Sequence, residues 1–339
     1  MFNASVNSYV DRHRLELKLR PILVGELYLA KKLFFPAYIF KNGTFAQVLG
    51  AGSVPGKEFI GVLLKNGYRE VYIFPEDSFQ IKKNLEIALI KITRSLSVGD
   101  PLQNGIKDIK LLSLNFAGLY KNPHDDELLM VQFQSSQNLS KFLLDQKKHQ
   151  SSYFHSLLQE NFHYTQSQPM LSSILLLSFL QALHLFNERE IENLFLTSYM
   201  KDIGLSMIPE DKYDLKTLSS RDEQLLSAHA DHSFDILEGR IPLAKSYLSI
   251  IKHHHFMNDK MKDLLQKEKS KSYEPDMIFG IESVLVSVFD ILVAMTSDRP
   301  YRKRLSLYQS LELIRKMMAD EYPQEFKALV IFLKQFYKN

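Results

Sequence analysis

Residues 281–295 read IESVLVSVFDILVAM, an almost wholly apolar stretch with a carboxylate, Asp290, in its interior. A run of this composition predicts a buried helix. Burying an unpaired carboxylate costs several kcal/mol in effective terms, so we expect Asp290 to be protonated or paired with a cation. A salt bridge to another helix or a metal ion would supply that cation.

A second carboxylate follows a helix that we expect to begin at Asn187, which has capping-box spacing to Glu190. The apolar stripe of this helix runs from Ile191 to Ser198, and the next position on the stripe is Asp202. A carboxylate therefore points where a core side chain is expected.

Histidines occupy comparable positions in two further helices. A helix that begins at Ser220 has a stripe through Leu225 and Leu226 to His229, although a lone buried histidine is more often a hydrogen-bonded core residue than a ligand. The run SYLSIIKHHH, residues 246–255, ends in three adjacent histidines. Each helical step turns about 100°, so at most two of the three can face one site.

Together these positions make a set of carboxylates and imidazoles on four separate helices. The candidate metal ligands are Asp202, His229, His253, His254 and Asp290. Such a set suits one or two first-row divalent ions, with iron or manganese favoured and zinc or nickel also suited. A bridging carboxylate can hold two metals about 3.5–4 Å apart for in-line attack on a phosphate.

Composition limits the class of protein. The 339 residues are enough for two domains, and the 42 basic and 39 acidic side chains are interspersed, so we expect no polynucleotide partner. The chain has no cysteine, which excludes disulfides and thiolate ligands. The longest apolar stretch, residues 174–186, is too short to span a bilayer, and we expect a cytoplasmic protein.

The N-terminal part is expected to form a small α/β module over residues 1–135, with a regulatory or interaction role. Residues 21–30 and 37–40 are expected to be strands, followed by a turn at Asn42 and a helix closed by Gly67. A strand at 69–74 and an amphipathic helix from Asp77 to about Leu96 come next, and the segment to 135 could be strand or helix.

The part from 150 to 339 is expected to be wholly helical, so the chain as a whole is α+β. Ser220 with Glu223 and Ser306 with Gln309 have capping-box spacing, and Gly239 follows the end of the helix that begins at Ser220.

Two segments resemble the HD-GYP family, the cyclic di-GMP phosphodiesterases of the HD superfamily. MTSDRPYRKRLS at 295–306 is similar to the family's TSDRPYR segment, and YMKDIGLSMIPED at 199–211 is similar to its HD-containing stretch. The resemblance covers about 150 residues and implies an all-helical HD-type domain. It places the family's metal ligands on the five residues named above.

The resemblance also implies which residues take part in catalysis and which hold the substrate. Asp202 and Lys201 become the catalytic candidates, while Arg299, Arg302 and Lys303 become candidates for holding substrate phosphates. Against the phosphate role, Arg299 and Arg302 could instead pin the loop before the last helix.

Departures from the family pattern fall on several chemically important positions. Lys201 replaces a metal-ligating histidine; it cannot donate a lone pair, and its charge repels a metal ion or takes the place of one. Leu205 replaces a lysine that acts on the phosphate or leaving group. His255 and Asn258 replace two acidic residues, and the Lys-rich segment 260–276 stands where a Gly-Tyr-Pro tripeptide belongs.

Three functions are consistent with this pattern. The chain is a working cyclic di-GMP phosphodiesterase, or a degenerate metal-binding domain that senses a nucleotide or binds a signalling protein, or a phosphohydrolase of another nucleotide with Lys201 and His255 as rebuilt parts of its site. The loss of both a ligand and a phosphate-side cation favours weak or lost hydrolysis.

Overall fold

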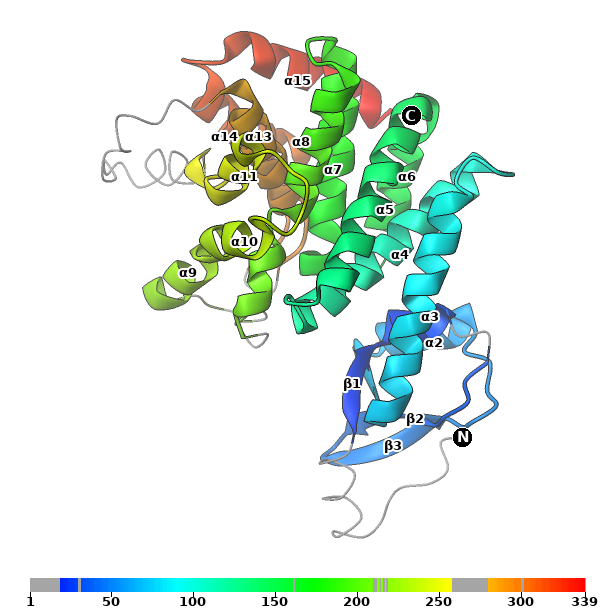
Figure 1. Cartoon of the computed structure of the whole chain (residues 1–339). Coiled ribbons are helices and arrows are strands. Elements are labelled where there is room, and N and C mark those ends of the chain that lie inside the picture. Colours follow the sequence, from blue (N-terminus) through cyan, green and yellow to red (C-terminus); the bar gives the residue numbers. More distant parts are fainter. Residues whose placement is uncertain are drawn as a thin grey trace. The chain divides into compact units, whose positions relative to one another are not determined.

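The computed structural model describes residues 19–29, 32–160, 162–209, 212, 213, 215, 217, 219–257, 280–299 and 302–338. The chain divides between Lys91 and Ile92 into two compact units (Figure 1). The sequence interpretation placed this boundary between residues 135 and 150. No helix in the described part of the chain is both long and apolar enough to cross a membrane.

The first unit contains a four-stranded sheet in the order β1-β4-β2-β3, and all of its strand pairs are antiparallel. Its elements are β1 (Arg20–Leu23), η1 (Val24–Leu29), β2 (Ala37–Lys41), β3 (Thr44–Leu49), α2 (Lys57–Lys65), β4 (Glu70–Ile73) and most of α3 (Pro75–Arg94). Val71 and Ile73 of β4 are fully buried, and Ile60 and Leu63 of α2 are buried too.

Two features of the first unit differ from the sequence expectation. The run 21–30 is not one strand, because the Glu26 carboxylate accepts from Leu23 N at 3.0 Å and turns the chain into the 3-10 helix η1. Strand β3 was not anticipated. Its hairpin with β2 is closed by Asn42 and Gly43, which have φ angles of 50° and 75°, so the expected turn is confirmed.

The second unit is all-helical, and together with the small sheet it confirms the α+β fold class. Its first helices are α4 (Pro101–Lys121), α5 (Asp126–Asp145), η2 (Lys147–His149), α6 (Gln150–Leu158), α7 (Tyr164–Leu183) and α8 (Glu188–Met200). Its later helices are η3 (Ile203–Met207), α9 (Ser220–Ser227), α10 (His229–Leu237), α11 (Lys245–Lys252), α13 (Ile281–Thr296), α14 (Leu307–Met318) and α15 (Pro323–Phe336).

Helix α7 is the centre of this unit (Figure 1). It is buried on nearly every side from Pro169 to Leu180 and packs against α6, α8, α13 and α15. Helices α4 and α5 join the same core, because Gln132 of α5 donates to Leu112 O at 2.9 Å and Tyr199 of α8 donates to the same carbonyl at 3.2 Å. This shared core explains why the unit begins near residue 92.

Helix starts follow the expected capping chemistry with one shift. The capping boxes at Asn187 and Ser306 are both confirmed. The box expected at Ser220 instead uses Ser219 and Asp222, so it begins one residue earlier.

The helix expected from Ser220 to Leu237 is interrupted at Ala228, which separates α9 from α10. None of the α9 residues is buried, so Leu225 and Leu226 do not extend the buried stripe as expected. At the junction, Nδ1 of the His229 ring forms a hydrogen bond with Leu226 O, a carbonyl in the last turn of α9. The buried stripe therefore begins at His229.

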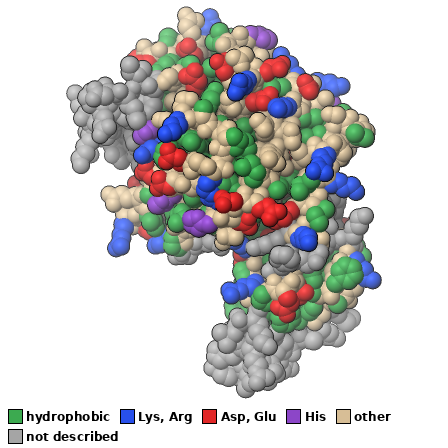
Figure 2. Space-filling view, in the orientation of Figure 1, with side chains coloured by type: hydrophobic (Ala, Val, Ile, Leu, Met, Phe, Trp, Pro, Cys, Tyr) green, Lys and Arg blue, Asp and Glu red, His purple; other side chains and the backbone are tan. Residues whose placement is uncertain are grey.

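Surface charge on the helical unit is mixed. Figure 2 shows acidic and basic side chains interspersed over its visible face, with several histidines among them.

Candidate metal centre

Three segments of the helical unit bring a carboxylate and three imidazoles together. Asp202 follows α8 and opens η3, His229 is the first residue of α10, and His254 and His255 lie in the turn after α11. Asp202 is 6%, His229 7% and His254 1% exposed, so this group is assembled inside the domain and not on its surface.

A glycine lets two of these segments touch. A Cβ on Gly204 would lie 2.1 Å from His229 O and 2.4 Å from Ser233 N, so only glycine fits between η3 and α10. Gly204 N donates to Ser233 Oγ at 2.8 Å, and Ser233 Oγ donates to Lys201 O at 2.6 Å. These bonds hold Asp202 beside His229.

The ring nitrogens converge on one point, which we call the histidine cluster (His229, His254 and His255). Nε2 of His229 lies 3.3 Å from Nε2 of His254 and 3.2 Å from Nε2 of His255. Asp202 Oδ1 lies 3.1 Å from His229 Nε2 and 3.5 Å from His254 Nε2. One ligand atom from each of the three histidines lies within 4.8 Å of the others, a spacing suited to a single metal ion.

Backbone carbonyls set the orientation of two rings. His254 Nδ1 lies 2.7 Å from Ile251 O, and His229 Nδ1 contacts Leu226 O. Each carbonyl accepts a hydrogen bond from Nδ1–H, which directs Nε2 toward Asp202 and the other imidazoles. Lone pairs in such proximity repel one another unless a proton or a cation lies between them. The donor set therefore fits a divalent metal ion.

The other half of the site is centred on Lys201. The Lys201 ammonium donates to Asp202 Oδ2 and, at 2.8 Å, to Asp290 Oδ1. Gln168 Nε2 of α7 donates to the same Asp290 oxygen at 2.6 Å. Asp290 thus has the cation that burial demands, and that cation is Lys201. Of the two pairings left open for Asp290, the structure shows the salt bridge, which joins it to Lys201 at the end of α8.

Burial and charge act in opposite directions on the two partners of the lysine contact. Burial alone would lower the pKa of Lys201, but the charges of Asp202 and Asp290 raise it above its usual value. Burial alone would raise the pKa of Asp202, but Lys201 and the hydrogen-bonded rings of His229 and His254 hold it well below its usual value.

The third ring of the cluster is kept neutral. Burial lowers the pKa of His255 well below its usual value, and His254 and His229 act in the same direction. A neutral imidazole is the form that binds a metal.

The adjacent histidines are used differently from the sequence expectation. The structure places His255, and not His253, with His254 in the cluster. Helix α11 ends at Lys252, and His253 is its C-cap with φ −113° and ψ 18°. The helical step of about 100° therefore no longer relates the three rings, and the rings of His254 and His255 lie 4.0 Å apart.

The arginines expected to hold phosphates are engaged with the protein. Arg302 donates to Ala294 O at 2.8 Å and Met295 O at 3.3 Å, which caps the end of α13. The Arg299 guanidinium lies 3.8 Å from the ring centre of Tyr164. These contacts correspond to the alternative in which both arginines pin the loop, while Lys303 is exposed.

Several residues of the sequence argument lie outside the described residues, namely Asn258, Pro300, Tyr301, Glu210, Asp211 and the Lys-rich segment 260–276. Leu205 lies on η3, where its carbonyl accepts from the Tyr213 hydroxyl.

Gln168 was missed by sequence reasoning. It belongs to a helix that is buried on nearly every side, so no periodic polar stripe marks it. A polar residue four positions after the start of a buried helix was the available signal, and it is too common to identify a site.

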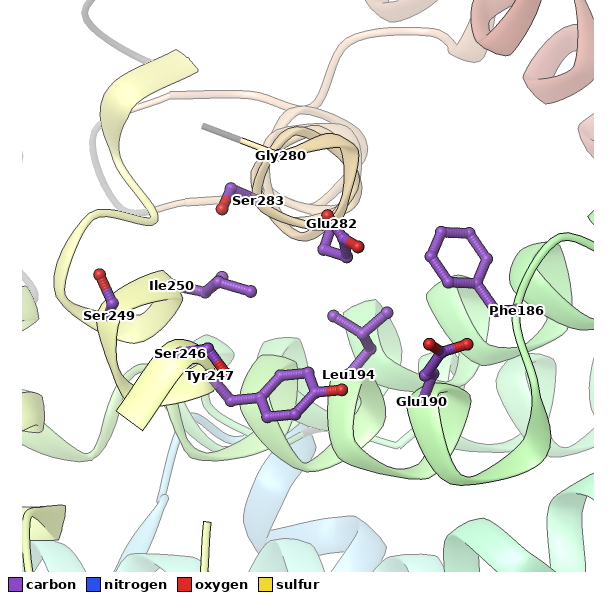
Figure 3. Close-up of a pocket in the computed structure, with 10 residues that line it drawn as sticks. All are labelled: Phe186, Glu190, Leu194, Ser246, Tyr247, Ser249, Ile250, Gly280, Glu282 and Ser283. Carbon is purple, nitrogen blue, oxygen red and sulfur yellow. The ribbon is translucent and has the colours of Figure 1, made fainter. Parts of the chain in front are cut away.

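A cavity of about 370 Å³ lies between α8, α11 and α13, the helices that lead to Asp202, the histidines and Asp290 (Figure 3). Ile250, four residues before His254, contributes to its wall, as does Tyr247. Glu190 and Glu282 also line it, and its described lining includes no lysine or arginine. Phosphates would be repelled there, so the cavity is not suited to a substrate phosphate.

Comparisons with known proteins agree with this architecture. A family model described as "HD domain" matches residues 155–325. Among solved structures, the chain is similar to Bd1817, described as a HDG"Y"P protein from Bdellovibrio bacteriovorus. The TM-score is 0.63 and the identity 17%, over 93% of this chain and 99% of that one. This likeness shows a shared fold. No curated protein matches the chain.

Proposed function

This chain belongs to the HD domain family, and on that premise we propose that it is a metal-binding domain of cyclic di-GMP signalling in which phosphodiester hydrolysis is weak or lost. The family match supports a metal-dependent phosphohydrolase of the HD type. The cyclic dinucleotide and the reduced activity are the finer parts of the proposal.

The convergence of three Nε2 atoms beside a carboxylate carries the metal-binding part. His229, His254 and His255 supply nitrogen, and Asp202 Oδ1 supplies oxygen 3.1 Å from the nearest of these nitrogens. When bound there, a divalent ion supplies a Lewis acid for a phosphate oxygen. The backbone carbonyls that hold the Nδ1 protons keep two of the rings in the binding orientation.

The engagement of nearby cations supports weak hydrolysis. Lys201 is bound to both carboxylates, and Arg302 is bound to the end of α13. Leu205 stands where the resemblance to HD-GYP proteins implies a lysine. Fewer positive charges are therefore free to stabilise the charge that develops on a phosphate.

A phosphohydrolase of another nucleotide is the second candidate. The presence of His255 in the cluster favours it, because this residue departs from the pattern of the cyclic di-GMP enzymes and yet takes a ligand position. An active cyclic di-GMP phosphodiesterase is the remaining alternative.

The test begins with the full chain purified without chelator. Metal content is measured by elemental analysis, cyclic di-GMP binding by calorimetry, and hydrolysis with Mn²⁺ or Fe²⁺ on cyclic di-GMP and on a panel of other nucleotides. Bound metal with nucleotide binding but little turnover supports the proposal. Rapid cyclic di-GMP turnover establishes the active enzyme, and turnover of another nucleotide alone establishes the second candidate.

Two neighbouring variants make a matched pair for the metal site. His255→Ala removes a cluster ring and should lose most of the bound metal, whereas His253→Ala removes the adjacent imidazole outside the cluster and should retain it. The reverse result would return the ligand role to His253. A chain with no metal in any preparation would rule out the proposed site.

A further inference from the structure

We infer that Lys201 is a permanent internal cation that fills a second cation position, so that the site binds one divalent ion per chain. This inference rests on the proposed metal site and names how many ions it takes. It also assigns a positioning role to Lys201 and Gln168, which hold Asp290 away from the metal.

Asp202 lies between the histidine cluster and the Lys201 ammonium. Its Oδ1 faces the histidine cluster at 3.1 Å from His229 Nε2, while its Oδ2 accepts from the Lys201 ammonium. A carboxylate with one oxygen on each of two cations is the arrangement found in sites with two metals. Here one of the two cations is covalently part of the chain.

Asp290 is held by two donors of the protein. Its Oδ1 accepts from Lys201 Nζ at 2.8 Å and from Gln168 Nε2 at 2.6 Å. Asp290 does not contact the histidine cluster in the hydrogen bonds and ion pairs of the described residues. Its charge is already satisfied, so it has no need of a metal ion.

The burial of Lys201 and the net charge of the site both limit the number of ions that can bind. Lys201 is 0% exposed, and its ammonium donates to both Asp202 Oδ2 and Asp290 Oδ1, so moving the ammonium out to admit a hydrated ion would break both ion pairs and leave two buried carboxylates unpaired. Lys201, Asp202 and Asp290 together carry one net negative charge. One divalent ion leaves one net positive charge, whereas a second would leave three in a buried space.

The same arrangement means that each of the two buried carboxylates has an ion-pair partner before any metal binds. The chain can therefore fold with Asp202 and Asp290 buried and paired, and bound metal adds stability without being required for folding.

The ion count is tested by titrating the metal-free full chain with Mn²⁺. Calorimetry monitors the titration, and elemental analysis after dialysis counts the bound ions. We expect one ion per wild-type chain. Lys201→His replaces the ammonium by a lone-pair donor and should bind two. Two ions in the wild type would overturn the inference, as would a single ion in Lys201→His that is folded by circular dichroism. No ion in the wild type would instead sink the proposed metal site itself.

The second measurement is thermal unfolding with and without Mn²⁺. Lys201→Met keeps a long side chain but removes the charge, so its melting temperature should rise more with Mn²⁺ than that of the wild type. An equal rise in both proteins would contradict the internal-cation role.

Lys252→Met is the matched control. Lys252 is also a lysine near the histidines, but it is exposed and lies 3.8 Å from the exposed Asp231. This variant should keep the wild-type ion count and the wild-type response to Mn²⁺.

Discussion

Gly204→Ala is the substitution that tests most directly how the fold assembles the site. The new Cβ would lie 2.1 Å from His229 O, whereas ordinary contact begins near 3.4 Å, so η3 and α10 must separate by about 1.3 Å. That movement pulls Gly204 N away from Ser233 Oγ and widens the gap between Asp202 and His229.

The expected cost follows from two effects. Overpacking of a buried contact costs about 1–3 kcal/mol, and leaving a buried donor without its partner costs about 1–3 kcal/mol more. We therefore expect the free energy of unfolding to fall by roughly 2–6 kcal/mol. Because Asp202 and His229 are displaced from each other, Mn²⁺ affinity should fall as well.

Urea unfolding followed by circular dichroism measures the stability, and calorimetry measures the Mn²⁺ affinity. Gly118→Ala in α4 is the control, since its Cβ would meet Leu128 Cδ2 of α5 at an ordinary 3.5 Å. Replacing a helical glycine by alanine should be neutral or stabilise by about 0.5–1 kcal/mol. A Gly204→Ala protein within 0.5 kcal/mol of wild type, with unchanged Mn²⁺ affinity, would refute the close-contact argument.

Three further predictions concern pH, metal and capping. Burial raises the pKa of Asp108 to about 8, so its carboxyl is protonated in the folded chain at pH values where the unfolded chain has lost the proton. Stability should therefore fall as pH rises from about 4 to about 8. Asp108→Asn, compared with wild type in urea titrations across that range, should flatten this dependence; an unchanged slope would exclude Asp108 as its source. Mn²⁺ at about 100 times its dissociation constant should add roughly 2.7 kcal/mol to the free energy of unfolding. EDTA should remove this gain, and His255→Ala should not show it in the same unfolding assay. Asn187→Ala breaks the capping box with Glu190 and should cost about 1 kcal/mol in urea unfolding, whereas a change below 0.3 kcal/mol would show that the cap does not stabilise α8.

The helical character of the second unit was readable from local chemistry. Capping at Asn187 and Ser306 and the buried run around Asp290 depend on neighbours within a few residues, and such signals survive in the sequence. The turn at Asn42 in the first unit was readable for the same reason. The membership of Asp202 and His229 in one group was also expected, because both interrupt apolar stripes.

Tertiary structure decided which charges meet. Whether Asp290 pairs with a metal or with a lysine depends on the approach of α8 to α13, and the contribution of Gln168 depends on α7 packing against both of them. The choice of His255 over His253 depends on the point where α11 ends. Sequence periodicity shows which side chains face inward, but the partner that a buried charge finds there is set by how close the helices come.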